Sequence, residues 1–210
     1  LAPVQALTRD TGAARFTGSQ RPDAETGGSR NSSFLIAADG TLDGYYDKIH
    51  LAPFGEYVPF GSHFPFIQKI VPIISDVEPG RETRVFSLEN RTFGPLICFE
   101  VLFAEMSEAL RRQGADFLVV ITNLGWFGSS NALEQELEQA RLRAIETRLA
   151  VVHCANPGIS GVFDPWGRFT ATNAMVTPSG GLHRLRGDLS PPDTNLFPCL
   201  GRPPVGEPAA

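Results

Sequence analysis

A strand, a helix and a second strand are predicted within the stretch FGPLICFEVLFAEMSEALRRQGADFLVVIT, residues 93–122. The first strand covers residues 93–99, and a helical pattern follows from Phe103 to Gln113, where Gly114 stops it. The second strand, Phe117–Thr122, is continuously apolar and rich in β-branched residues, which is typical of a strand buried on both faces. This succession of strands and helices indicates an α/β fold.

The same alternation continues on both sides of this stretch. A helix is predicted at Ala132–Thr147 and a further buried strand at Ala150–Ala155. Upstream, two short strands at Ser33–Ala37 and Leu42–Tyr46 flank Asp39-Gly40, a strong turn signal, and predict a hairpin. The pattern therefore predicts an α/β fold for the middle of the chain.

Composition divides the chain into three parts. Residues 1–30 are dominated by Gly, Ser, Thr, Arg and Pro, and we expect them to be poorly ordered or to be a truncated start. Residues 31–193 are expected to form one domain, and residues 194–210 a Pro-rich tail. A chain of 210 residues with 42% hydrophobic content is long enough to bury a core.

Charge and cysteine content exclude several classes of function. A net charge of -5 and a pI near 5.4 provide no basic surface for nucleic acid. Three cysteines without a C-x-x-C pair predict neither a disulfide scaffold nor a metal site, and we expect no cofactor. No apolar run reaches the roughly 18 residues that a membrane-spanning helix requires, so none is predicted in these residues.

Cys98 is the candidate nucleophile. It lies at the end of a predicted buried strand and before a helix, where an α/β fold presents reactive groups and a helix N-terminus favours an anion. A thiolate in that position can attack a carbonyl carbon. From position alone, a strand cysteine is more often a small buried residue without chemistry.

Two charged residues of one loop strengthen the case for Cys98. Lys48 and Glu56 lie in a loop, residues 46–59, that prolines make rigid and non-helical. A lysine beside a tetrahedral intermediate would stabilise the oxyanion and favour the thiolate. Taken singly, loop charges such as these are more often solvent-facing.

Five segments together resemble one family, the bacterial apolipoprotein N-acyltransferases of the carbon-nitrogen hydrolase (nitrilase) superfamily. The resemblance extends in order from about residue 31 to about residue 193, and its narrowest element is the lysine loop. The segments are YDKIHLAPFGEYVP at 46–59, GPLICFE at 94–100, NLGWFG at 123–128, QARLRAIE at 139–146, and NPGIS at 156–160 followed by DPWG at 164–167.

The resemblance implies a fold and a set of site residues. The fold would be an α-β-β-α sandwich, incomplete at its amino-terminal side. Cys98 would be the nucleophile and Lys48 the oxyanion lysine, while Glu56 and Glu100 would orient the lysine and the thiol. Trp126 and Phe127 would form an apolar wall beside an acyl chain, or else belong to the core under a loop.

The resemblance also implies a reaction and a location. A phospholipid would donate a fatty acyl group to Cys98 as a thioester, and the N-terminal amine of a diacylglyceryl-cysteine lipoprotein would accept it. The enzyme would reside in the bacterial inner membrane through segments outside this chain, with its catalytic domain on the periplasmic side.

Departures from the family pattern leave two other readings open. The general-base glutamate of the family has no counterpart before Lys48, so we expect it upstream of Leu1 and expect this chain to be a fragment. Leu124 replaces an aspartate, and Glu136 replaces a histidine. The alternatives are a soluble amidase or nitrilase of the same superfamily, and a catalytically inactive domain of the same fold.

Overall fold

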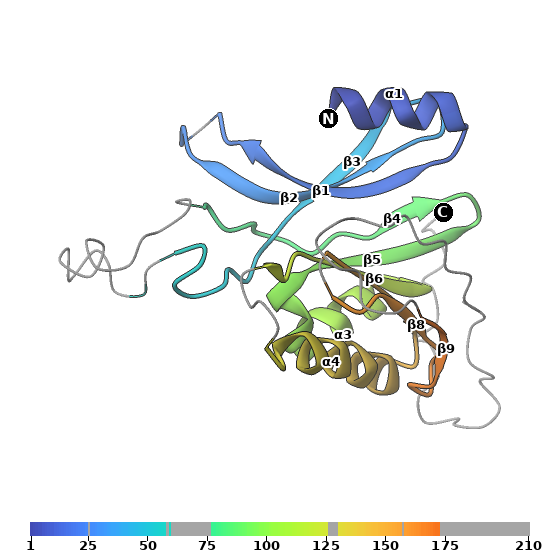
Figure 1. Cartoon of the computed structure of the whole chain (residues 1–210). Helices are drawn as coiled ribbons and strands as arrows, with labels where there is room; N and C mark the ends of the chain where they lie inside the picture. The colour runs from blue at the N-terminus through green and yellow to red at the C-terminus, as the bar shows by residue number, and fades with distance from the viewer. Residues whose placement is uncertain (25, 58, 60–76, 126–129, 157, 173–210) are drawn as a thin grey trace, which may run out of the picture. The chain divides into compact units, whose positions relative to one another are not determined.

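A computed structural model describes residues 1–24, 26–57, 59, 77–125, 130–156 and 158–172. The chain forms two compact units, Leu1–Thr83 and Arg84–Ala210, and each is described by itself. In Figure 1 the first unit is drawn mainly in blue and the described part of the second in green to orange.

The first unit contains a three-stranded antiparallel sheet in the order β1-β2-β3. Its strands are β1 (Arg15–Pro22), β2 (Ser29–Ile36) and β3 (Leu42–Asp47). The predicted hairpin is confirmed, because β2 and β3 are joined by a tight turn in which the Asp39 carboxylate accepts the backbone N–H of Thr41 at 2.9 Å. The sheet ends beside Lys48, the first residue after β3.

The amino-terminal residues are more regular than predicted. The expectation of a poorly ordered start was wrong for residues 2–22, which form helix α1 (Ala2–Thr11) and strand β1. Proline in the first turn starts the helix and Gly12, at φ 62°, ends it. Thr8 is the only fully buried residue of α1, and no residue of β1 is fully buried, so neither element has an apolar face that a search for hydrophobic periodicity would detect. They are held by pairing with β2 and by a bond from Gln5 Nε2 to Gly40 O of 3.1 Å.

The second unit contains a six-stranded sheet in the order β4-β5-β6-β7-β8-β9. Strands β5, β6 and β7 are parallel to one another, and the outer strands pair antiparallel. The strands are β4 (Phe86–Leu88), β5 (Arg91–Ile97), β6 (Phe117–Thr122), β7 (Ala150–Ala155), β8 (Gly161–Phe163) and β9 (Phe169–Thr172). The α/β fold predicted from this part of the sequence is confirmed, and the centre of its sheet is parallel.

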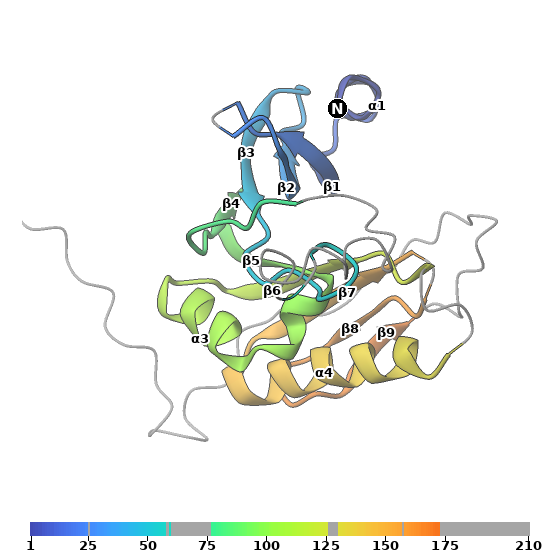
Figure 2. The ribbon, with the colours of Figure 1, turned by 90° about the vertical axis from the view of Figure 1, so that its left-hand side faces the viewer.

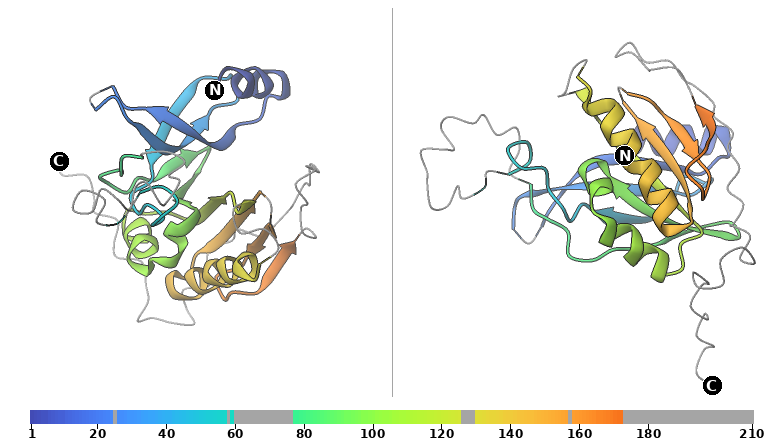
Figure 3. Two further views of the ribbon diagram at one scale, coloured as in Figure 1. Left: turned by 60° about the vertical axis from the view of Figure 1, so that its left-hand side comes forward. Right: turned by 90° about the horizontal axis from the view of Figure 1, so that it is seen from below.

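Two helices cover one face of this sheet (Figure 2). They are α3 (Ala104–Arg112) and α4 (Ala132–Thr147), which make the crossovers from β5 to β6 and from β6 to β7. Gly94 permits the close approach of α3, since a Cβ at this position would lie 2.8 Å from the Cβ of Leu110. Figure 3 shows α3 and α4 against the same strands from two further directions.

The other face of the six-stranded sheet is less buried. Val119 and Val152 are half-buried on it, and Cys154 is exposed. The prediction that Cys154 lies inside a buried strand was therefore wrong on burial, because alternate residues of β7 point to opposite faces.

His153 lies on the helix-covered face of β7 and is fully buried. Its Nδ1 lies 3.0 Å from the carbonyl of Ile159, so the proton must be on Nδ1. Nε2 is buried and has no hydrogen-bond partner among the described residues. Burial lowers the pKa of His153 to about 4, and the bond to Ile159 offsets this only in part.

The neutral His153 predicts acid sensitivity. The unfolded chain takes up a proton near the ordinary pKa of 6.5, whereas the folded protein resists it until about 4. Stability is therefore complete above pH 6.5 and is lost progressively as the pH falls to about 4, by about 3 kcal/mol. Urea denaturation across this range should show His153→Leu losing this part of the pH dependence, while Val152→Ala should lower stability equally at each pH. An unchanged slope in His153→Leu would contradict the prediction.

Candidate active site

The carboxyl ends of the three parallel strands meet at one edge of the six-stranded sheet. Cys98 follows β5, Asn123 follows β6 and Asn156 follows β7. The last two ends are tied together, since Asn156 N donates to Thr122 O at 2.9 Å and Leu124 N donates to Asn156 O at 3.2 Å. This is the edge at which open α/β sheets bind ligands.

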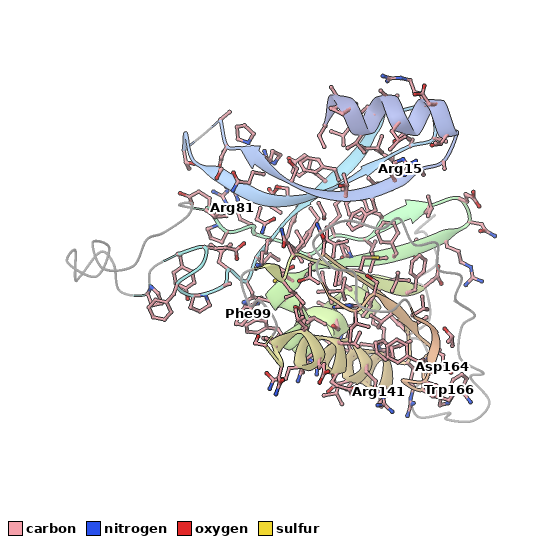
Figure 4. All side chains as sticks on the ribbon, viewed as in Figure 1. Arg15, Arg81, Phe99, Arg141, Asp164 and Trp166 are labelled. Carbon is pink, nitrogen blue, oxygen red and sulfur yellow. The ribbon has the colours of Figure 1, made fainter. Side chains whose placement is uncertain are left out.

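Cys98 adopts a backbone conformation that few non-glycine residues occupy. The strand ends at Ile97 rather than at the predicted residue 99, because Cys98 has φ 52° and begins a short 3₁₀ helix, η1 (Cys98–Leu102). Its side chain is half-buried and the thiol is not in a disulfide. Phe99, labelled in Figure 4, is the next residue of this turn. A strained residue at the carboxyl end of a central strand is a mark of functional sites.

Glu100 holds this turn from within. Its side chain is fully buried, and its Oε2 accepts the backbone N–H of Ile97 at 2.8 Å. Because Ile97 precedes Cys98 and Glu100 follows it, this hydrogen bond joins the two sides of the turn that contains Cys98. Glu100 thus holds the backbone on both sides of Cys98, and its predicted role in orienting the thiol stays a prediction.

Arg143 secures the other end of η1. It is buried on α4, donates to Leu102 O at 3.2 Å from Nη1, and pairs with Glu146 at 3.0 Å from Nη2. The sequence contained a signal for this role, namely an arginine on the apolar face of an amphipathic helix. Residue-by-residue reasoning did not assign it to the site.

Lys48 and Glu56 form a buried ion pair in the first unit. The Lys48 side chain is 2% exposed and that of Glu56 16%, and Nζ lies 2.6 Å from Glu56 Oε2. The same oxygen accepts the backbone N–H of Ala52 at 2.7 Å. Neither residue is a solvent-facing loop charge. Since Lys48 and Cys98 belong to different units, their mutual approach stays a prediction.

Gly80 binds the main chain of Lys48, and only glycine fits at this position. Lys48 O accepts the N–H of Gly80 at 2.7 Å, and a Cβ at Gly80 would lie 2.2 Å from the backbone oxygen of Asp47. We expect Gly80→Ala to lower the free energy of unfolding by about 2 kcal/mol, because the backbone at Asp47 or at residue 80 must move to admit the new Cβ. Urea denaturation measures this. Gly55→Ala is the control, since its Cβ would meet Ala52 only at 3.8 Å; an equal loss in both variants would contradict the expectation.

The two substitutions relative to the family pattern are both buried. Leu124 is 1% exposed and packs near Gly158, and Glu136 lies on the buried face of α4. Leu124 thus fills a core position in the loop after β6. Trp126 and Phe127, the predicted acyl-chain wall, lie outside the described residues.

The DPWG segment makes the β8–β9 turn, where Figure 4 labels Asp164 and Trp166. The Asp164 carboxylate accepts the N–H groups of Trp166 and Arg168, both at 2.9 Å, and pairs with Arg168 Nε at 2.6 Å. Burial alone would raise the pKa of Asp164, but the bonds from Arg168 and Trp166 outweigh it and lower the pKa. This segment is a structural turn.

The described residues contain neither a metal-binding cluster nor a membrane-spanning helix. No group of three or more His, Cys, Asp or Glu side chains in these ranges could hold a metal ion. Within the same part of the chain, every helix is too short or too polar to cross a bilayer.

An α/β sheet that carries a strained cysteine at the end of a parallel strand defines a class of proteins suited to thiol chemistry. The carbon-nitrogen hydrolase family model matches residues 1–178. The chain belongs to the carbon-nitrogen hydrolase family, and its fold class is the nitrilase-type α/β fold that the resemblance implies.

Relatives and solved structures agree with this assignment. The chain is 40% identical to the apolipoprotein N-acyltransferase of Geobacter metallireducens over 168 residues, 78% of this chain and 32% of that protein. It is 40% identical to the Agrobacterium fabrum protein of the same name over 174 residues, 79% of this chain and 32% of that protein. The chain thus spans about a third of the length of these relatives. An amidase from Nesterenkonia sp. superposes with a TM-score of 0.63 at 21% identity, covering 83% of this chain and 62% of the amidase, and supports the fold.

Proposed function

We propose that this chain is the nucleophile-bearing part of an N-acyltransferase. It would move a fatty acyl group from a phospholipid, through a thioester on Cys98, to the N-terminal amine of a diacylglyceryl-cysteine lipoprotein. The main support is the Cys98 turn, strained at φ 52° and closed by buried Glu100 at the end of β5. The name shared by relatives at 40% identity supports the choice of reaction.

The reaction proceeds in two balanced steps. The Cys98 thiol gives up its proton and attacks the ester carbonyl of the phospholipid, a carbon–sulfur bond forms, and the ester carbon–oxygen bond breaks as the lysophospholipid alcohol leaves with that proton. The lipoprotein amine then attacks the thioester, a carbon–nitrogen bond forms, and the thiol is released with the proton that the amine gives up. A thioester is reactive enough to acylate an amine.

Lys48 and Glu56 support both steps in this proposal. Each attack places negative charge on a carbonyl oxygen, which the Lys48 ammonium stabilises. Glu56 orients that ammonium group through the 2.6 Å pair. Because both oxygens of Glu56 accept hydrogen bonds, we assign it to orientation rather than to proton transfer.

The partners and location follow from the reaction. Donor and acceptor are lipids or lipid-bearing proteins, so the enzyme would act at the bacterial inner membrane, with this part on the periplasmic side. No role for nucleic acid is proposed, which agrees with the net charge of -5.

The test uses the intact protein that contains this chain and a phospholipid labelled in its acyl chains. After brief incubation without acceptor, the tryptic peptide of residues 92–111, whose single cysteine is Cys98, is examined for an acyl adduct. We expect the adduct in wild type, its absence in Cys98→Ala, and its loss from wild type on adding a lipoprotein amine.

Cys154→Ala is the matched control, since this cysteine is exposed on β7 and is not part of the proposed site. Its adduct should equal that of wild type. An undiminished adduct in Cys98→Ala would end the proposal. Absence of any adduct together with hydrolysis of small amides would indicate an amidase, and absence of both would indicate an inactive domain.

A further inference from the structure

The structure assigns to Asn31 the role of a positioning residue, which fixes Glu56 so that Glu56 in turn fixes Lys48. This inference rests on the proposed function, because it concerns the lysine that serves the acyl-transfer step. It concerns a side chain outside the nucleophile, the lysine and the two glutamates that the sequence singled out.

Asn31 contacts both members of the ion pair. Its backbone oxygen accepts the N–H of Lys48 at 2.8 Å, as β2 runs beside the end of β3. Its side-chain Nδ2 donates to Glu56 Oε1 at 2.7 Å. One residue therefore holds the main chain of the lysine and, separately, the carboxylate that receives its ammonium.

The bond to Oε1 decides which way the Glu56 carboxylate faces. The other oxygen, Oε2, already accepts Lys48 Nζ at 2.6 Å and Ala52 N at 2.7 Å. A terminal carboxylate torsion is broad and is fixed only by its partners. With both oxygens engaged, Glu56 cannot rotate without breaking a bond, and Lys48 Nζ keeps a single position.

The chemistry of the contact requires an amide. An ionised carboxylate only accepts hydrogen bonds, so the atom that faces Glu56 Oε1 must be a donor, which Asn31 provides and aspartate does not. Aspartate at this position has the same shape but would place a second carboxylate opposite Glu56. Asn31→Asp therefore replaces an attractive hydrogen bond with repulsion between two carboxylates, with little change in side-chain volume.

The kinetic test compares Asn31→Ala and Asn31→Asp with wild type in the intact protein. Both substitutions retain the backbone bond to Lys48 N, so they remove only the side-chain contact. We expect kcat to fall at least about tenfold in each, with the KM for the phospholipid within about twofold, since misplacement of an oxyanion donor acts on the transition state. Ser33→Ala is the matched control: this buried serine lies two residues along β2, and its hydroxyl has no partner among the described residues.

A double-variant cycle tests whether Asn31 acts through Glu56. In Asn31→Asp/Glu56→Gln the donor and acceptor are exchanged across the same contact, and the number of negative charges is unchanged. If the two side chains act as a unit, the loss of kcat in the double variant is smaller than the product of the two single losses by at least about fivefold. Losses that simply multiply would overturn the inference.

A readout independent of turnover separates this inference from the proposed function. Limited acetylation with acetic anhydride, followed by mass spectrometry, compares Lys48 with Lys69, the other lysine of the chain. Because Lys48 is buried and paired, we expect slow labelling in wild type and in Ser33→Ala, and labelling at least about threefold faster in Asn31→Ala. Lys48 labelling in Asn31→Ala within about twofold of wild type would overturn the role of Asn31. Absence of the Cys98 adduct in wild type would instead overturn the proposed function and leave this test standing.

Discussion

Replacement of Lys48 by alanine is expected to lower the rate of acyl-enzyme formation at least about a hundredfold. The proposed reaction develops a full negative charge on a carbonyl oxygen, and loss of one such charge-stabilising donor typically costs a factor of about 10²–10³. Single-turnover formation of the Cys98 adduct measures this rate directly. A change below about threefold would show that the lysine has only a structural role.

Stability must be followed in the same Lys48 variants, because the structure makes the residue part of a buried ion pair. Removing one partner leaves the Glu56 carboxylate, 16% exposed, with two neutral donors and no cation among the residues that the structure describes. Lys48→Arg retains the charge and is the matched control. We expect it to keep most of the stability but to recover little of the rate, since its planar head cannot place a point charge where Nζ lies.

The middle of the fold was predictable because its periodicity is strong. Helix α4 and strands β6 and β7 begin and end at the residues that the sequence predicts. Each has an apolar pattern long enough to override local ambiguity. By contrast, α1 and β1 have weak patterns, and they depend on long-range contacts with β2 and with Gly40.

The local geometry of the candidate site was less accessible to sequence reasoning. The residues around Cys98 have strong strand propensity, and φ 52° there is stabilised by the carboxylate of Glu100, two residues further on. Asn31 and Glu56 lie 25 residues apart in a strand and a loop, so no periodicity links them. Residue types could nominate Cys98, Lys48 and the two glutamates, but hydrogen-bond partners come only from tertiary structure.

Replacement of Glu100 by alanine is expected to have the second large effect, on stability and on activity together. The buried N–H of Ile97 would lose its acceptor and a cavity would form, which together cost about 3 kcal/mol. Without the bond that spans Cys98, the strained turn is free to relax toward an extended strand. We therefore expect at least about a hundredfold loss in the rate of adduct formation.

Glu100→Gln distinguishes geometry from charge at this position. The amide has nearly the same shape, and its oxygen can still accept the N–H of Ile97, so the turn around Cys98 should persist. If Glu100 acts by shaping the turn, the variant should keep its free energy of unfolding within about 1 kcal/mol of wild type, because the net contribution of one hydrogen bond is of this size. It should also keep at least about a tenth of the wild-type rate of adduct formation, since that energy corresponds to roughly a factor of ten. A variant that is as stable as wild type but as inactive as Glu100→Ala would refute this role, because only the negative charge of Glu100 would then have been lost.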